Sequence, residues 1–271
     1  MINSDDLQTA KYLTKENIAS LAPAVFATKP SSDVSEKYTH IPTERVIDDM
    51  ELLGWKPIEA KEVKARKKST MGFQKHLLVF RNDDVVINGE DGDTVFPQIL
   101  MTNSHDGKNS FTFAAGLYRL ICSNGLVIAD TKFEDIKMRH MGYTFEDLQA
   151  LIKDMVEKLP LTVESMNRMK ATEMEELAIL DFAKEALNTR FTKKEMNRIQ
   201  IDLKELTKPV RNEDKGSDLW SVFNVVQEKI VTGDFDYTIG TKHRKAREIK
   251  NFKQDMKINK ELFKVALEYA A

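Results

Sequence analysis

The chain has 271 residues, enough for one large domain or two small ones, and its 41% hydrophobic and 31% charged residues are typical of a soluble globular protein. No apolar run approaches the roughly 20 residues needed to cross a bilayer, and a single cysteine excludes both an internal disulfide framework and a multi-cysteine zinc site within the chain. The net charge of −2 is near zero, but the charges are unevenly placed.

The N-terminal part of the chain predicts two helices separated by a polar segment. Residues 1–6 are acidic and lack the apolar core of a signal peptide, so we expect a cytoplasmic protein. Residues 14–27 predict a short helix capped by the threonine that begins it, and the polar residues 28–40 predict an exposed linker or arm. A second, amphipathic helix follows from residue 43 and is ended by Gly54.

Extended segments follow the second helix. Alternating or apolar patterns predict strands over 56–67, 71–81 and 95–102. The dipeptides Asn88-Gly89 and Asp91-Gly92 are strong turn signals between them. These strands together predict an antiparallel β-meander.

The apolar run 111–121 is compatible with a buried strand or a buried helix. Because Asn124-Gly125 is typical of a helix C-terminus, we predict helix for the second half of the run. Short strands are predicted over 126–129 and 133–140.

From Thr144 onward the apolar pattern changes to the helical period. The first of these helices is expected to break at Leu159-Pro160. Further helices are predicted to begin at about residues 163, 172, 192, 217 and 251. The fold class is therefore α+β, with an N-terminal mixed domain of antiparallel β-meander and packed helices, followed by a helical C-terminal half. We expect an N-terminal helical arm over 1–27, a core domain over 28–142 and a helical region over 143–271.

Two segments carry most of the excess positive charge. Residues 56–81 contain eight Lys/Arg against two acids, and residues 242–264 contain nine against three. Basic side chains near aromatic residues suit a single nucleic-acid strand, because charges track phosphates and rings stack on bases. The alternative is two solvated faces without a ligand. The candidate nucleic-acid-binding residues are Lys64, Arg66, Lys67, Lys68, Lys75, Lys242, Arg244, Lys245 and Arg247.

One group of residues raises the alternative of catalysis. His105, Asp106, Cys122, Asn124 and His140 include the types that form a nucleophile, a base and an orienting group. A lone cysteine in an apolar run is more often a small core residue, and the other members are explained as loop and turn residues. A divalent metal held by the histidines and Asp106 matches no motif with a defined spacing. We expect no catalytic residue, no metal and no cofactor.

Short motifs spread over roughly residues 30–250 are specific in combination. They are Tyr38…Ile41-Pro42-Thr43, Leu53-Gly54-Trp55, Asn103-Ser104-His105-Asp106-Gly107, Gly116-Leu117-Tyr118-Arg119-Leu120-Ile121-Cys122-Ser123-Asn124-Gly125-Leu126, His140 and Leu219-Trp220-Ser221-Val222-Phe223-Asn224-Val225-Val226. In these motifs the chain resembles a family found widely in phages, prophages and plasmids, the phage/plasmid-like proteins with a domain of unknown function (number nine hundred and thirty-two). Family members often carry Thr-Glu-Tyr after the tryptophan helix, where this chain has Gln227-Glu228-Lys229. The resemblance implies no established activity.

A second, weaker resemblance concerns the order of elements around residues 43–80. A helix, then Gly-Trp, then a basic antiparallel meander is similar to the core of phage and eukaryotic single-strand annealing proteins, which form rings or filaments and hold single-stranded DNA in a positively charged groove. This resemblance implies a phage or mobile-element protein of recombination or replication, in the host cytoplasm, that binds single-stranded DNA as a homo-oligomer. A module that binds a phage or host protein, such as an inhibitor of host defence or restriction, is the main alternative, and a Cys/His-dependent enzyme is the third.

Overall fold

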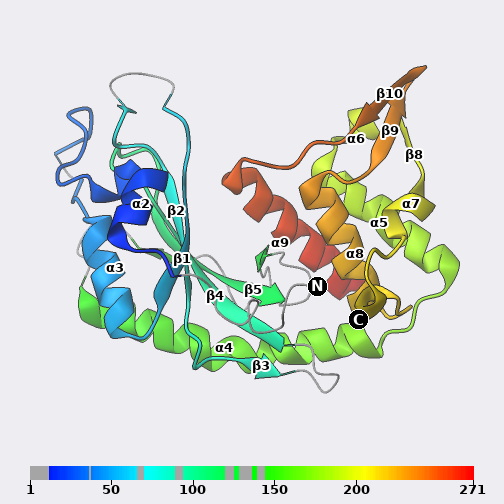
Figure 1. Cartoon of the computed structure of the whole chain (residues 1–271), viewed down its shortest axis with the longest axis horizontal. Coiled ribbons are helices and arrows are strands. Elements are labelled where there is room, and N and C mark those ends of the chain that lie inside the picture. The colour runs from blue at the N-terminus through cyan, green and yellow to red at the C-terminus, as the bar shows by residue number, and fades with distance from the viewer. Residues whose placement is uncertain are drawn as a thin grey trace. The chain divides into compact units, whose positions relative to one another are not determined.

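The computed structural model has the α+β architecture that the sequence predicts (Figure 1). The structure describes residues 12–36, 38–65, 70–88, 94–119, 125–127, 136–138 and 144–271. The chain divides into two compact units, one made of residues 1–126 and 132–159, the other of residues 127–131 and 160–271. Among the described residues, no helix is both long enough and apolar enough to span a membrane.

The first unit is organised around an antiparallel sheet. Its strands follow the order β1 (Lys56–Glu62), β2 (His76–Arg81), β4 (Thr94–Asn103), β5 (Phe111–Arg119) and β6 (Gly125–Val127), while β3 (Ile87–Asn88) pairs with β4 and β7 (Ile136–Met138) pairs with β5. Every residue of β2 is buried, because β2 lies between β1 and β4 and both of its faces are covered. The predicted meander is confirmed, although β1 ends at Glu62 and β2 begins only at His76, so both strands are shorter than expected.

The helix predicted for the second half of 111–121 is wrong, because β5 continues as a strand to Arg119. It pairs with β4 from Thr112, opposite Thr102, to Arg119, opposite Val95. Sheet pairing of this length outweighs a local helix-stop signal. Gly125, taken as that signal, instead begins β6.

Helices α2 (Lys15–Leu21) and α3 (Thr43–Leu52) pack near β1, with the 3-10 turn η1 (Pro23–Phe26) after α2. The predicted cap of α2 is confirmed, since the Thr14 hydroxyl accepts from the backbone N–H of Asn17. Gly54 follows α3 at φ +83°, a left-handed conformation that glycine adopts at little cost.

The expectation of an exposed arm over residues 28–40 is wrong for part of this segment. Ser31 is buried, and its backbone N–H donates to the carbonyl of His105 at 2.8 Å. The Tyr38 hydroxyl donates to the carbonyl of Ser104 at 3.0 Å. Polar groups of this segment hydrogen-bond to the loop after β4. The polar composition of residues 28–40 therefore did not mean that the whole segment is exposed to solvent.

The break predicted at Pro160 is also wrong, because α4 (Phe145–Ala171) continues through it. An interior proline removes one backbone hydrogen bond and costs about 3 kcal/mol or more. Apolar side chains are buried on both sides of the proline, for example Met155 and Met169, and each such burial yields roughly 1.5–3 kcal/mol. This burial offsets the cost. The boundary between the two units falls at the same proline.

The second unit is built from α5 (Glu176–Arg190), α8 (Leu219–Thr232) and α9 (Phe252–Tyr269), which contact one another. Short helices α6 (Lys193–Met196), α7 (Leu203–Thr207) and η4 (Asn212–Asp214) connect them. Trp220 in α8 is 3% exposed and stacks on Phe223, which in turn meets Phe263 of α9 edge to face. Trp220 is thus a core residue of the second unit.

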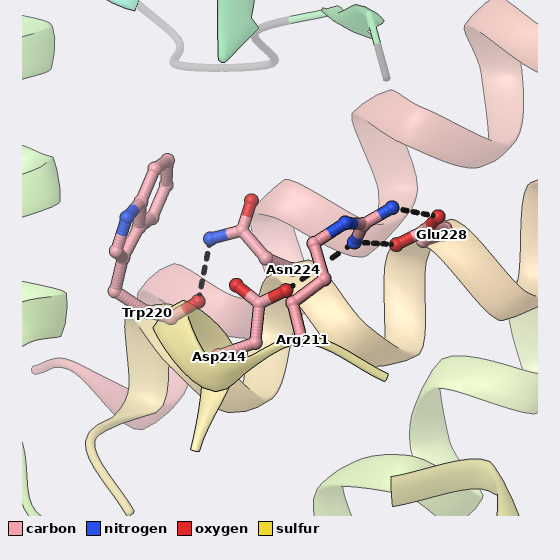
Figure 2. Close-up of polar contacts among 5 residues, drawn as sticks. All are labelled: Arg211, Asp214, Trp220, Asn224 and Glu228. Carbon is pink, nitrogen blue, oxygen red and sulfur yellow. Dashed lines mark hydrogen bonds and ion pairs between the residues drawn. The ribbon is translucent and has the colours of Figure 1, made fainter. Parts of the chain in front are cut away.

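Polar contacts secure the two ends of α8. The Asp218 side chain caps the helix by accepting from the N–H of Ser221 at 3.0 Å. Figure 2 shows the Arg211 guanidinium lying against two carboxylates, with bonds to both oxygens of Glu228 and an ion pair to Asp214 at 3.3 Å. These contacts hold η4 and the residue before it against α8.

The second unit also contains a three-stranded antiparallel sheet that the sequence analysis did not predict. Its order is β10 (Lys242–Lys245), β9 (Asp236–Ile239) and β8 (Ile199–Ile201). The C-terminal half is therefore mainly but not wholly helical.

Candidate nucleic-acid interface

The β9–β10 hairpin carries three of the predicted nucleic-acid-binding residues, Lys242, Arg244 and Lys245, and a fourth, Arg247, follows β10. Ile239 pairs with Lys242, so the turn consists of only Gly240 and Thr241. Gly240 has φ +60°, as the first position of a two-residue hairpin turn requires. Figure 1 shows the hairpin extending beyond the helices of its unit.

The base of the hairpin is held by Arg190, the last residue of α5. Its guanidinium donates to the carbonyl of Ile230 at the end of α8 and to that of Arg247 after β10. The same guanidinium lies over the rings of Phe235, at 5.3 Å, and Phe191, at 5.8 Å. Burial lowers the pKa of Arg190 from its usual value, but an arginine remains protonated at neutral pH. One half-buried cation thus ties α5, α8 and the chain after β10 together.

A glycine makes a second close contact at this base. Gly233 ends α8 at φ +74°, and a Cβ there would lie 2.5 Å from the carbonyl carbon of Arg247. Only a residue without a side chain lets the chain after β10 pass so near the helix end. The close approach of Gly233 and Arg247 therefore fixes the position of the hairpin base relative to the end of α8.

The cations of β10 are exposed. All four residues from Lys242 to Lys245 are solvent-accessible, and Arg247 beyond the strand is exposed as well. Lys245 forms an ion pair with Asp234 at 3.3 Å, whereas the described residues provide no ion pair for the side chains of Lys242, Arg244 or Arg247.

Further positive charge lies next to the hairpin. Lys193 and Lys194 in α6 and Arg198 just before β8 are exposed, and the register places Arg198 beside the turn at Gly240. Together, residues 193–198 and 236–247 contain seven Lys/Arg against two acids. We call this set the basic wing. Its local field favours a polyanion although the whole chain is slightly acidic.

The first basic segment offers fewer free charges among the described residues. Lys64 is exposed, but Lys75 is only half-exposed, and Lys61 forms an ion pair with Glu59. Arg81, which contributes to the excess charge of the segment, is 2% exposed, pairs with Asp83 at 2.6 Å and lies over the Phe96 ring. Three more of the predicted binding residues, Arg66, Lys67 and Lys68, lie outside the described residues. In the part of the chain that the structure describes, the two basic segments are therefore not equivalent.

The residues considered for catalysis are placed only in part. Cys122, Asn124 and His140 lie outside the described residues. His105 and Asp106 lie in the loop between β4 and β5, and not between a strand and a helix. The Asp106 carboxylate accepts hydrogen bonds from the Ser104 hydroxyl at 2.8 Å and from the backbone N–H of Lys108 at 3.1 Å. Asp106 thus stabilises the turn, as the sequence predicts.

His105 packs with two other histidines in a histidine cluster formed by His40, His76 and His105. Ring centroids are 4.6 Å apart for His40 and His105 and 5.2 Å apart for His76 and His105. His76 and His105 are fully buried, and Thr43 at the start of α3 lies between them. Within the described part of the chain, no group of His, Cys, Asp and Glu side chains has the geometry to hold a metal ion.

The hydrogen bonds of the cluster fix the proton positions. The Gln74 carbonyl can only accept, so His76 carries its proton on Nδ1 and its Nε2 accepts from the Thr43 hydroxyl at 2.9 Å. The Thr43 oxygen then accepts from Asn103 Nδ2, at 3.0 Å, and from His105 Nε2, at 3.3 Å. His76 is neutral in this arrangement, and burial lowers its pKa to about 4. The cluster joins β2, β4 and α3 and has the character of a core polar network.

Comparison with known proteins identifies a family for the chain but assigns it no role. A family model described as a domain of unknown function (DUF932) matches residues 30–263. The chain belongs to the DUF932 family. Among relatives of this DUF932 protein, the UPF0380 protein YafZ of Escherichia coli (strain K12) is 26% identical over 257 residues. The UPF0380 protein YfjQ of the same strain is 25% identical over 257 residues, and in both cases the match covers 94% of this chain and 90% of the relative. No solved structure matches the chain.

Several residues of the interface were not found from the sequence. Arg190, Phe191, Gly233 and Tyr237 shape the hairpin, yet only the Gly240-Thr241 turn between alternating residues could have indicated it. The contacts of Arg190 join positions 40 and 57 residues apart in the chain, which no local pattern reveals.

Proposed function

We propose that this DUF932 protein binds single-stranded DNA without strong sequence preference and acts as a single-strand annealing protein in recombination or replication of a phage or another mobile element. The observation that carries the proposal is β10, a strand with all four residues exposed, three of them Lys or Arg. A strand normally buries one of its faces. β10 is exposed on both faces, so its cationic side chains do not contribute to a core and are accessible to a ligand.

The hairpin suits a nucleic-acid strand in two further respects. Its base is fixed by Arg190 and Gly233, so little conformational freedom is lost when a ligand binds. Phosphate contacts release counterions, which supplies affinity that does not depend on sequence. Repetition of the basic wing in a homo-oligomer would extend the binding surface along one strand and would bring two strands together for annealing.

The experiment compares three proteins in binding and in annealing of complementary labelled strands. The hairpin variant changes Lys242, Arg244, Lys245 and Arg247 to Ala. The control variant changes the exposed Lys29, Lys108, Lys153 and Lys184 to Ala, and so removes the same charge outside the basic wing. We expect the wild type and the control variant to bind and anneal, and the hairpin variant to do both weakly.

The binding must also respond to salt. For a single strand, log affinity falls with log salt by about 0.7 per neutralised phosphate. Mass photometry of the same mixtures measures the size of the protein–DNA assemblies. Absence of wild-type binding to single-stranded DNA at low salt would refute the proposal and favour a protein partner for this surface.

A further inference from the structure

The small sheet has one face that carries apolar side chains and one face that is wholly polar. Directly opposite residues in an antiparallel pair share a face, so the register places Tyr237 between Ile201 and Arg244, and Ile239 between Ile199 and Lys242. We call these six residues the aromatic face. The opposite face carries Gln200, Asp236, Thr238, His243 and Lys245.

The aromatic face is not covered as a core face would be. Its apolar members are only half-buried, whereas the buried strand β2 of the first unit exposes almost nothing. Phe191 touches one edge of it, with its ring centroid 5.7 Å from that of Tyr237. Apolar surface therefore remains in contact with water beside exposed cations. Such a surface suits a ligand whose flat apolar part can pack on the apolar side chains while its anionic part contacts the cations.

We propose that the aromatic face stacks unpaired nucleobases, with Tyr237 as the stacking ring and Lys242 and Arg244 on the adjacent phosphates. This inference rests on the proposed function and specifies its ligand as a strand with free bases. Cross-strand neighbours lie about 5 Å apart at Cβ, so a base on the Tyr237 ring has its backbone within reach of the Arg244 guanidinium. A duplex keeps its base faces in its own stack and cannot offer them to a ring.

The aromatic ring beside the cations favours nucleic acid over an acidic peptide as the occupant, because a base stacks on a ring whereas a carboxylate side chain does not. The aromatic face contains two cations and no acid, and its only hydrogen-bonding group besides the cations is the Tyr237 hydroxyl. The ring is also held in place, because Tyr237 lies against Phe191, which with Phe235 packs around the Arg190 guanidinium. A ring held in position stacks with little loss of side-chain freedom.

The test measures fluorescence anisotropy with three probes of equal length: a thymidine 30-mer, a 30-mer of abasic nucleotides, and a 30-base-pair duplex. The proteins are the wild type, Tyr237→Leu, Tyr237→Phe and, from the opposite face, Thr238→Ala. We expect the wild type to bind the thymidine strand about tenfold or more tightly than the abasic strand. Tyr237→Leu should lose that preference and bind both strands as the wild type binds the abasic one. Tyr237→Phe and Thr238→Ala should bind as the wild type does.

A second measurement keeps the test valid if Tyr237→Leu folds poorly. Photo-crosslinking of the wild type to a strand with 5-iodouracil, followed by mass spectrometry, should attach the base to Tyr237. Equal wild-type affinity for the thymidine and abasic strands, or a crosslink confined to other residues, would overturn the stacking inference while leaving charge-driven binding intact. No wild-type binding to any of the three probes would overturn the proposed function and the stacking inference together.

Discussion

Lowering the pH should destabilise the first unit through His76. Its imidazole is fully buried and accepts a hydrogen bond from Thr43, and burial lowers its pKa from 6.5 to about 4. Between these two values the unfolded chain binds a proton that the folded chain does not, so stability is complete above about pH 6.5 and falls as the pH drops toward 4. One pKa unit corresponds to about 1.4 kcal/mol, which predicts a loss of about 2.5 kcal/mol at pH 4.5. His40, whose pKa burial also lowers, acts in the same direction.

The assay uses the two tryptophans, which lie in different units. Trp55 is 2% exposed in the first unit, and a Trp220→Phe background leaves it as the single fluorescent reporter. Urea unfolding of this background at pH 7.5, 6.5, 5.5 and 4.5 should show the decline. His76→Gln should be less stable at pH 7.5 and should show a flatter profile. His243→Gln, on exposed β10, should keep the original profile.

Two results would contradict this reasoning. A first unit equally stable at pH 7.5 and pH 4.5 would mean that His76 is not held neutral by burial. An undiminished decline in His76→Gln would assign the effect to other groups.

Three further changes test other parts of the account. Gly233→Ala should destabilise the second unit by about 1–3 kcal/mol in urea unfolding, because it combines a left-handed backbone with a clash against the Arg247 carbonyl; no change in stability would reject this close approach. Trp220→Ala should cost about 3–5 kcal/mol through loss of a buried side chain, and a melting temperature like that of the wild type would argue against its core position. Cys122→Ala should leave DNA binding intact, as expected for a small core residue; loss of binding with the fold preserved would revive the enzyme hypothesis.

Local signals predicted well those elements whose stability is itself local. The Thr14 cap began α2 as expected, and apolar spacing located α3 because its buried Val46, Ile47 and Met50 follow one face. β4 was predictable because its long apolar run is flanked by turn residues.

The errors arose where distant parts of the chain decide the structure. β5 is a strand because β4 pairs with it along its length, and α4 passes Pro160 because buried side chains on both sides outweigh one lost hydrogen bond. For the interface, the sequence identified the cations of β10 by charge alone. It did not show that Arg81, equally basic, would be buried against Asp83 and Phe96.

The most direct test of the central claim is the salt dependence of single-stranded DNA affinity for the wild type, the hairpin variant and the control variant. The account predicts that the slope of log affinity against log salt becomes shallower by up to about 3 in the hairpin variant, which is four lost phosphate contacts at about 0.7 each. The control variant should keep the wild-type slope, and all three proteins should unfold at the same urea concentration because the changed side chains are exposed. An unchanged slope and affinity in the hairpin variant would contradict the assignment of the β9–β10 hairpin as the DNA-binding element.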